Sequence, residues 1–145
     1  MCNIRQAYYI GVLRIRQAEK KALLKGTGNA FLFGLSWSPD GKRIAVGGNT
    51  AMVWVLDAST GDVLYTYSGH TDHVGDVAWS PDGIHIASGS SDQTVQIFKA
   101  TDGTNIYTYR GQSGHLDAVT WSPDGKRIAS GSDSSSSTVQ VWQAS

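Results

Sequence analysis

The stretch that decides the fold is Trp37–Ala45, which reads Trp-Ser-Pro-Asp-Gly-Lys-Arg-Ile-Ala. The same nine residue types return in the same order over Trp121–Ala129, and seven of the nine return over Trp79–Ala87. The leading tryptophans are 42 positions apart in both steps. A fixed period of this size is typical of stacked copies of one supersecondary unit. The sequence therefore predicts a repeat protein in which each leading tryptophan is packed and precedes a tight turn.

The middle copy shows how one period divides into short strands. Apolar, β-branched and aromatic residues suited to strands occupy residues 62–67, 74–79, 84–88 and 94–99. Between the second and third of these segments, residues 80–83 (Ser-Pro-Asp-Gly) carry proline second and glycine fourth, which is the chemistry of a type I turn. Short, evenly spaced strands with polar turns predict an all-β array and not alternating strands and helices.

Charge and composition limit the classes of partner. The 145-residue chain has no net charge, but residues 1–30 sum to +5 and the remainder to −5. A neutral chain with a mildly acidic body disfavours nucleic-acid binding, which depends on neutralising phosphates. Cys2 is the single cysteine, so no disulfide forms within the chain, which fits a reducing compartment. No stretch has the length and apolarity of a membrane span or a secretory signal, so we expect a cytoplasmic protein with no membrane partner.

Residues 1–20 match the repeat poorly and admit two interpretations. Apolar residues at helical spacing, from Ile4 to Ile15, form one face of a potential amphipathic helix. Residues 8–18 also look like a worn copy of the final strand at 138–144. This segment is therefore expected to be either a degenerate strand or a helical extension.

The motifs of the remaining chain resemble the WD-repeat (WD40) β-propeller family, in its repeat-rich bacterial form. Besides the Trp-Ser-Pro-Asp-Gly hairpin, they are the Gly69-His70 pair, the Ile-Ala-Ser-Gly-Ser strand at Ile86–Ser90, and a Val-x-Val-Trp strand ending at Trp142. The resemblance implies four-stranded antiparallel blades that bury their apolar faces by stacking radially. It covers residues 21–144.

Three repeats are expected over residues 21–145, at about 21–58, 62–100 and 104–145. The blade-to-blade core is expected to contain one isoleucine and one further apolar residue from each copy. These residues are Ile44, Ile86, Ile128, Leu35, Val77 and Val119.

The resemblance also implies a hydrogen-bonded set inside each blade, made of a His, a strand Ser or Thr, a turn Asp and a strand Trp. Only the middle copy approaches the full set, although Phe98 stands where the Trp is expected, and the third copy has Gln112 in place of the His. Buried polar groups without partners are costly, so incomplete sets are expected to be local weak points. The members, copy by copy, are Trp54 in the first; His70, Ser88 and Asp92 in the second; and Ser130, Asp133 and Trp142 in the third.

Two kinds of chemistry compete with this structural interpretation. His70, Asp72 and Ser88 are the residue types of a hydrolytic triad, although the structural set accounts for His70 and Ser88 without a cleft. His70 and His73 lack a third ligand at metal-binding spacing, and no glycine-rich turn follows the phosphate-binding pattern. We therefore predict no catalytic residue, no metal and no cofactor.

By the same resemblance, a protein or peptide partner is expected at one rim, where the Gly-His turns meet the loops between the third and fourth strands. Exposed aromatic residues there are typical binding anchors, although Phe33 has the alternative of packing where the first copy has lost its His. The candidate rim residues are Phe31, Phe33, His73, Gly75, Ser91, His115, Asp117 and Ser132.

The register of the repeats predicts unpaired ends. The sequence stops after the third strand of the last blade, and residues 21–25 form an orphan strand with no blade before them. Propellers usually contain about four to eight blades. Either the chain is a fragment, or residues 21–25 complete the last blade of a second copy, giving a homodimer that closes a six-bladed ring.

The function predicted from the sequence is that of a non-enzymatic scaffold or regulatory module that binds a protein or peptide. The alternative is a propeller domain of, or accessory to, a hydrolase or peptidase. A nucleophile and a base clustered at a central tunnel would favour that alternative.

Overall fold

The computed structural model describes residues 30–133 and 137–144, and every regular element within them is a β-strand. The strands are β1 (Leu32–Trp37), β2 (Arg43–Gly48), β3 (Val53–Asp57), β4 (Val63–Tyr67), β5 (Val74–Trp79), β6 (His85–Ser90), β7 (Val95–Lys99), β8 (Asn105–Tyr109), β9 (Leu116–Trp121), β10 (Arg127–Ser132) and β11 (Val139–Gln143). None of the described residues forms a helix that could cross a membrane.

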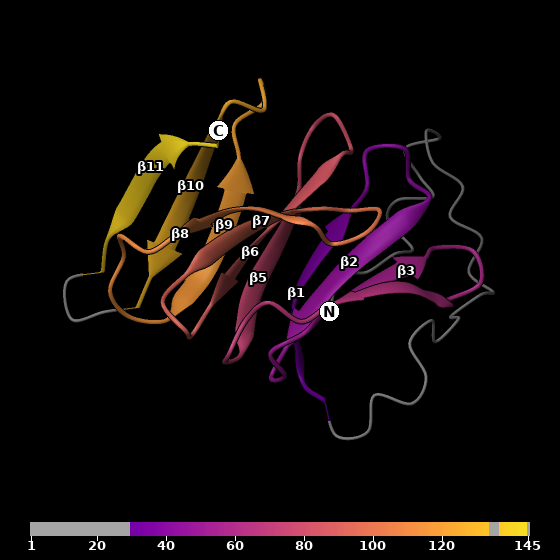
Figure 1. The fold of residues 1–145 in the computed structure, drawn as a ribbon, viewed down its shortest axis with the longest axis horizontal. Helices are drawn as coiled ribbons and strands as arrows, with labels where there is room; N and C mark the ends of the chain where they lie inside the picture. Colours follow the sequence, from indigo (N-terminus) through magenta and orange to yellow (C-terminus); the bar gives the residue numbers. More distant parts are fainter. Residues whose placement is uncertain (1–29, 134–136, 145) are drawn as a thin grey trace, which may run out of the picture.

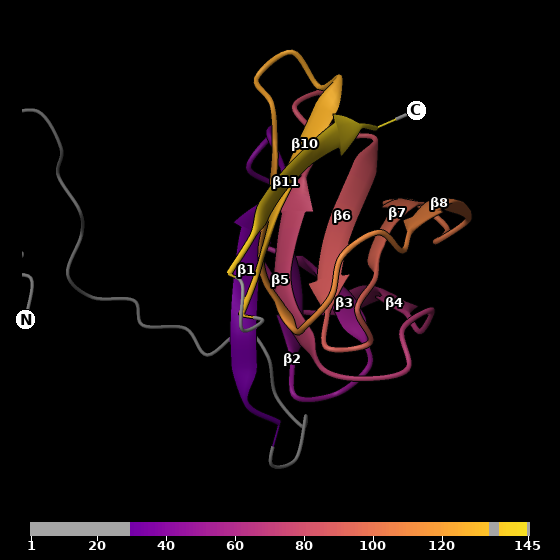
Figure 2. The ribbon, with the colours of Figure 1, turned by 90° about the vertical axis from the view of Figure 1, so that its left-hand side faces the viewer.

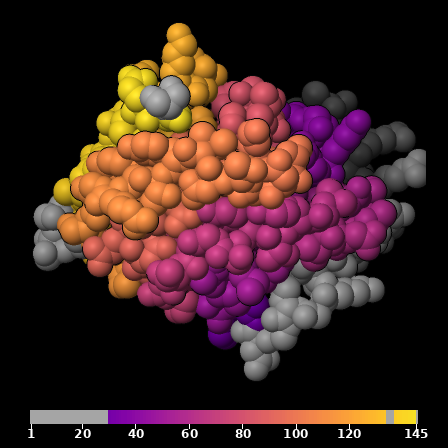
Figure 3. All heavy atoms as spheres, in the orientation of Figure 1, coloured from indigo at the N-terminus to yellow at the C-terminus, as the bar shows by residue number. Residues whose placement is uncertain are grey.

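The strands form three antiparallel sheets, which we call blade 1 (β1–β4), blade 2 (β5–β8) and blade 3 (β9–β11). Strands pair in chain order within each blade, and among the first strands of the blades β5 contacts both β1 and β9. The blades stand side by side in chain order (Figure 1), and their surfaces meet in the space-filling view (Figure 3). The prediction of all-β propeller blades in an unclosed ring is confirmed.

The repeated Ser-Pro-Asp-Gly segment forms the predicted tight turn. In blade 2 the Gly83 N–H donates to the Ser80 carbonyl at 2.9 Å, and Gly83 has φ of +73°, which favours glycine. The Ser80 hydroxyl accepts the His85 N–H at 2.9 Å and donates to Asp82 at 2.5 Å. The other two copies repeat these contacts, so the motif serves to join the first two strands of each blade.

Two apolar clusters join the blades. Val55 of blade 1 packs in one cluster with Val77 and Phe98 of blade 2. Ile97, on the opposite face of blade 2, packs in the other cluster with Ile128 of blade 3. Blade 2 is therefore covered on both faces, and burial of these faces is the main stabilising contribution.

Two residues expected in the core are exposed. Leu35 is 66% exposed and Trp37 is 61% exposed, whereas their counterparts Val77 and Trp79 are only 3% and 6% exposed. Ile44, also expected in the core, is only partly buried. These side chains lie on the face of blade 1 that points away from blade 2. Their counterparts in blade 2 are covered by blade 1, but no described residues cover this face of blade 1.

Several predictions fall on residues outside the described ranges. They are the strand or helix at residues 1–20 and the orphan strand at residues 21–25 that would close a ring. Within the described residues blade 3 has three strands, as the register of the repeats predicted.

Candidate functional site

The predicted hydrogen-bonded set of the middle copy comes together inside blade 2. His70 lies in the turn before β5, Ser88 lies on β6, and Asp92 follows β6. The His70 Nε2 atom lies 2.7 Å from the Ser88 hydroxyl, and the Nδ1 atom lies 2.8 Å from the Asp92 carboxylate. The imidazole is fully buried. The set thus ties the turn, the second strand and the following loop together.

Asp92 is the electrostatic centre of this set. Its carboxylate also accepts hydrogen bonds from the Thr71 N–H at 3.1 Å and from the Thr94 hydroxyl at 2.6 Å. Burial by itself raises the pKa of Asp92, but the hydrogen bonds from His70 and Thr94 overcome it and hold the pKa well below its usual range. Asp92 is therefore ionised wherever the blade is folded near neutral pH.

The same contacts reproduce the order of a Ser-His-Asp relay, with Asp92 as the acid in place of the candidate Asp72. Asp72 is exposed, and its carboxylate oxygen lies 3.8 Å from the Nε2 atom of the exposed His73 ring. The Ser88 side chain has no exposed surface, so a substrate has no access to the hydroxyl in this conformation. A hydrolytic nucleophile must reach the reacting carbon, and this arrangement supports a structural role.

In blade 3, Gln112 rebuilds the set that the missing His was expected to weaken. The Gln112 carbonyl oxygen accepts from the Ser130 hydroxyl at 2.6 Å, and its amide donates to the Ser130 and Thr138 carbonyls at 3.3 and 3.1 Å. The Trp142 indole N–H points to the Ser130 hydroxyl at 3.5 Å. The expectation of a weak point here was wrong, because an amide can both donate and accept.

Asp133 belongs to a different contact from Asp92. Its carboxylate accepts the His115 N–H at 3.0 Å, and the Asp133 N–H donates to the His115 carbonyl at 3.1 Å. Ser91 makes the corresponding backbone contact in blade 2, where its N–H donates to the His73 carbonyl at 2.9 Å. Asp133 is therefore the counterpart of Ser91, which stands one 42-residue period earlier in the sequence.

The register also corrects the position of Trp54. Trp54 pairs with Val46, as Gln96 pairs with Ser88 and Gln140 with Ser130. Trp54 is therefore the counterpart of the two glutamines. Trp142 corresponds instead to Phe98 and Leu56, since these three pair with the repeated isoleucines. In the first copy Val46 stands at the position of Ser88, and Thr50, one period before Asp92, stands in place of the carboxylate.

Those glutamines make contacts between blades that the sequence analysis missed. The Tyr67 hydroxyl of blade 1 bonds to the Gln96 amide of blade 2, and the Tyr109 hydroxyl of blade 2 bonds to Gln140 of blade 3 at 2.5 Å. The sequence signal was present, because Tyr67 and Tyr109 are one 42-residue period apart. A Tyr–Gln pair thus crosses each blade interface near its outer strands.

The candidate rim is built by a backbone clamp that occurs in every blade. In blade 1 the Asn49 side chain accepts the Phe31 N–H at 2.9 Å, and the Asn49 N–H donates to the Phe31 carbonyl at 2.8 Å. The His73–Ser91 and His115–Asp133 contacts hold the same positions in the other blades. The clamp fixes the backbone at positions 31, 73 and 115. The side chains there therefore project from equivalent places in the three blades, whatever their residue type.

Most of the proposed rim side chains are accessible. Phe31 is 68% exposed and Phe33 is 55% exposed, so Phe33 does not serve mainly to fill the blade. His73, His115 and Asp117 are also exposed, and Ser91 is partly buried.

Two candidates are poorly placed for a partner. Ser132 is buried, and its hydroxyl lies 3.4 Å from that of Thr138. Gly75 packs so closely on blade 3 that a side chain there would collide with the Leu116 carbonyl. Both residues therefore contribute to packing below the rim surface.

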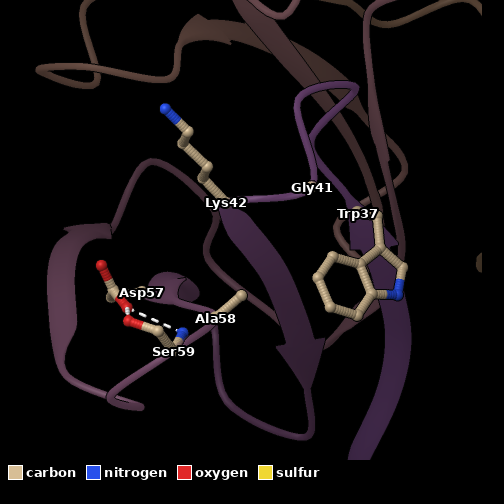
Figure 4. Close-up of a pocket in the computed structure, with 6 residues that line it drawn as sticks. All are labelled: Trp37, Gly41, Lys42, Asp57, Ala58 and Ser59. Atoms are coloured by element: carbon tan, nitrogen blue, oxygen red, sulfur yellow. Dashed lines mark hydrogen bonds between the residues drawn. The ribbon is translucent and has the colours of Figure 1, made fainter.

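At the opposite end of β1 a shallow pocket of about 350 Å³ lies beside the exposed Trp37 indole (Figure 4). Lys42 and Asp57 also line it, and Asp57 accepts the Ser59 N–H at 2.8 Å. Hydrogen bonds from the hydroxyl and N–H of Ser59 lower the pKa of Asp57 to about 2. Across residues 30–133 and 137–144 no three metal-ligating side chains gather into a site, here or elsewhere.

Two protein-family models match this chain. The model of the WD domain, G-beta repeat, matches residues 61–99 and 103–143, which together exceed half of the chain. The chain belongs to the WD-repeat family. The model of the anaphase-promoting complex subunit 4 WD40 domain also matches residues 10–75. Each G-beta match begins just before the last strand of one blade, so a WD sequence repeat links two blades.

Among curated proteins, short matches occur to the U5 small nuclear ribonucleoprotein 40 kDa protein. The Mus musculus protein is 44% identical and the Homo sapiens protein 42% identical over 43 residues, which is 30% of this chain. The match spans only 12% of the length of those relatives. The chain is similar to them over about one WD repeat.

Proposed function

We propose that this WD-repeat chain is a non-enzymatic cytoplasmic scaffold or regulatory module that binds a protein or peptide through the rim at the start of β1, β5 and β9. The observation that carries the proposal is the contrast between a constant clamp and variable side chains. Equivalent backbone contacts hold Phe31, His73 and His115, while the residue types at these positions differ.

The blade 1 part of this rim is apolar. Phe31 and Phe33 lie two residues apart at the start of β1, and both are largely exposed. Buried aromatic anchors carry much of the energy of protein interfaces, and a polar surround excludes water from them. His73 before the neighbouring strand β5, and His115 and Asp117 at the start of β9, supply polar groups along the same rim. We therefore expect an apolar or aromatic partner side chain to contact Phe31 and Phe33.

The comparisons agree with an assembly role without defining a partner. The names of the matched mammalian relatives place those proteins in a small nuclear ribonucleoprotein. What we carry over is only that a similar WD repeat functions within a larger assembly.

The proposal is tested by selecting peptides from a random display library against the intact chain and measuring their affinity by calorimetry. Phe33→Ala is expected to weaken selected peptides at least about 10-fold, as for an interface anchor. Leu64→Ala is the matched control, because Leu64 is equally exposed but lies on the outer strand β4. Peptides that bind both variants like the wild type would overturn the rim assignment.

A hydrolase function finds no support in the buried Ser88. Turnover of generic ester or peptide substrates that disappears in Ser88→Ala, with the fold intact by circular dichroism, would contradict the non-enzymatic proposal.

A further inference from the structure

The two ends of the row of blades expose apolar surfaces that are buried between blades elsewhere. On blade 3, Val139 is 77% exposed and Val141 is 62% exposed, whereas their blade 2 counterparts Val95 and Ile97 are buried. On blade 1, Leu35 and Trp37 are exposed as described above. Figure 2 views the molecule from the blade 3 end, where β10 and β11 lie in front of the other blades.

The exposed surface of blade 3 is a shallow apolar groove of about 290 Å³, which we call the blade 3 groove. It is lined by Asp76, Ala118, Val119, Thr120, Ala129, Ser130, Gly131 and Val139. The internal interfaces show what fills such a groove. At Gly47 of blade 1 an added Cβ would lie 2.6 Å from Val74 of blade 2, and at Gly89 of blade 2 it would lie 3.2 Å from Leu116 of blade 3.

Gly131 of blade 3 is the counterpart of Gly47 and Gly89, and no described residue of another blade packs against it. The nearest atom to an added Cβ there is the Ala118 Cβ of its own blade, at 3.6 Å. At Gly47 the next closest residue to the added Cβ, after Val74, is Val77. At Gly89 the next closest, after Leu116, is Val119. One period earlier in the sequence, the counterparts of Val74 and Val77 are Leu32 and Leu35, which are both exposed.

Stacking contacts on the leading tryptophans of blades 2 and 3 follow the same rule. The Arg43 guanidinium of blade 1 lies 4.6 Å from the ring of Trp79 in blade 2, and the His85 ring of blade 2 lies 6.5 Å from that of Trp121 in blade 3. The residue after Arg43 and His85 in this series is Arg127, and the remaining one of the three leading tryptophans is Trp37. Arg127 and Trp37 lie at opposite ends of the molecule.

We propose that two copies of this chain pack head to tail, with Leu32, Leu35 and Trp37 of one copy seated in the blade 3 groove of the other. Leu32 covers Gly131, as Val74 and Leu116 cover the equivalent glycines, Leu35 packs beside it, and Arg127 stacks on Trp37. A head-to-tail contact closes a ring where the rotation allows, and two copies give six blades, within the usual range. This inference is independent of the rim proposal and uses only described residues.

The first test measures molar mass by light scattering and Kd by sedimentation. Leu35→Glu puts a charge into the apolar groove, and Gly131→Val fills it. Each is expected to weaken self-association at least 10-fold. Leu64→Glu is the matched control, because its counterpart Ile106 stays exposed on the doubly covered blade 2. Circular dichroism should show all three variants folded.

The second test mixes the two defective variants and records native mass spectra. Each variant keeps one good end, so the mixture should form a Leu35→Glu with Gly131→Val heterodimer while each variant alone stays monomeric. Recovery of a heterodimer also shows that both variants are folded.

Three outcomes would overturn the proposal. One is a wild-type chain that stays monomeric at high concentration. Another is a Gly131→Val variant that still forms homodimers, which indicates a symmetric contact through blade 1 alone. The third is a dimer that both variants leave unchanged.

Discussion

Blade 2 and blade 1 carry nearly the same motif but bury it differently. Trp79 is packed between blades and Trp37 is exposed, although the residues that follow both tryptophans begin Ser-Pro-Asp-Gly. Blade 2 also has the His70 set, whereas blade 1 has the apolar Val46 at the position of Ser88. The turn motif therefore fixes the shape of each blade, and the neighbouring blades decide how much each residue contributes to stability.

Substitution of the buried Trp79 is expected to lower the stability most, and far more than the same substitution of the exposed Trp37. Trp79→Ala is expected to lower the free energy of unfolding by about 3–5 kcal/mol, because it leaves a cavity between blades. Trp37→Ala should cost less than about 1 kcal/mol, measured in the Gly131→Val background so that a second copy does not cover the ring. Urea unfolding gives both values. Equal losses would show that blade 1 is covered by other parts of the chain.

The next effect concerns the polar set of blade 2. His70→Leu is expected to cost about 2 kcal/mol, because it removes a partner from buried Ser88 and from Asp92. His70→Gln should cost about half as much, since Gln112 performs this role in blade 3. Adding Ser88→Val to His70→Leu imitates blade 1 and should recover part of the loss. A double variant less stable than His70→Leu would contradict this account.

Acid should weaken blade 2 through Asp92. The folded pKa of Asp92 lies below its unfolded value, so the unfolded chain binds the proton more readily and stability falls as pH drops below about 4. Each unit of depression contributes about 1.4 kcal/mol. Asp92→Asn should therefore lose less stability between pH 7 and pH 3 than the wild type. Asp62→Asn, an exposed change in blade 1, is the control and should follow the wild-type curve.

The smallest expected effect lies in the Tyr–Gln pairs between blades. Tyr67→Phe should cost about 1 kcal/mol, because the buried hydroxyl also accepts the Asn105 amide at 2.8 Å. Tyr109→Phe should cost about half of that, since its pair with Gln140 is only partly buried. Thermal unfolding with both single variants tests the order. A larger loss for Tyr109→Phe would place the main contact between blades 2 and 3.

The sequence by itself determined the strands, the turns and their grouping into WD-type blades. These features depend on contacts between residues close in the chain, such as Ser80 with Asp82 and His85, and they recur at a fixed period. The trio of His70, Ser88 and Asp92 was predicted through the resemblance to WD repeats, since only the middle copy carries all three residue types.

Which copies of a residue are buried, and which contacts replace the lost ones, depends on packing between segments that are distant in the chain. Leu35 and Val77 occupy the same position in their repeats, yet only Val77 has a blade against it. Gln112 makes the contact with Ser130 that His70 makes with Ser88, and the side chain of Asp133 accepts the His115 N–H. Burial and hydrogen-bond partners depend on segments distant in the chain, and a 42-residue period alone does not show where the row of blades has a neighbour.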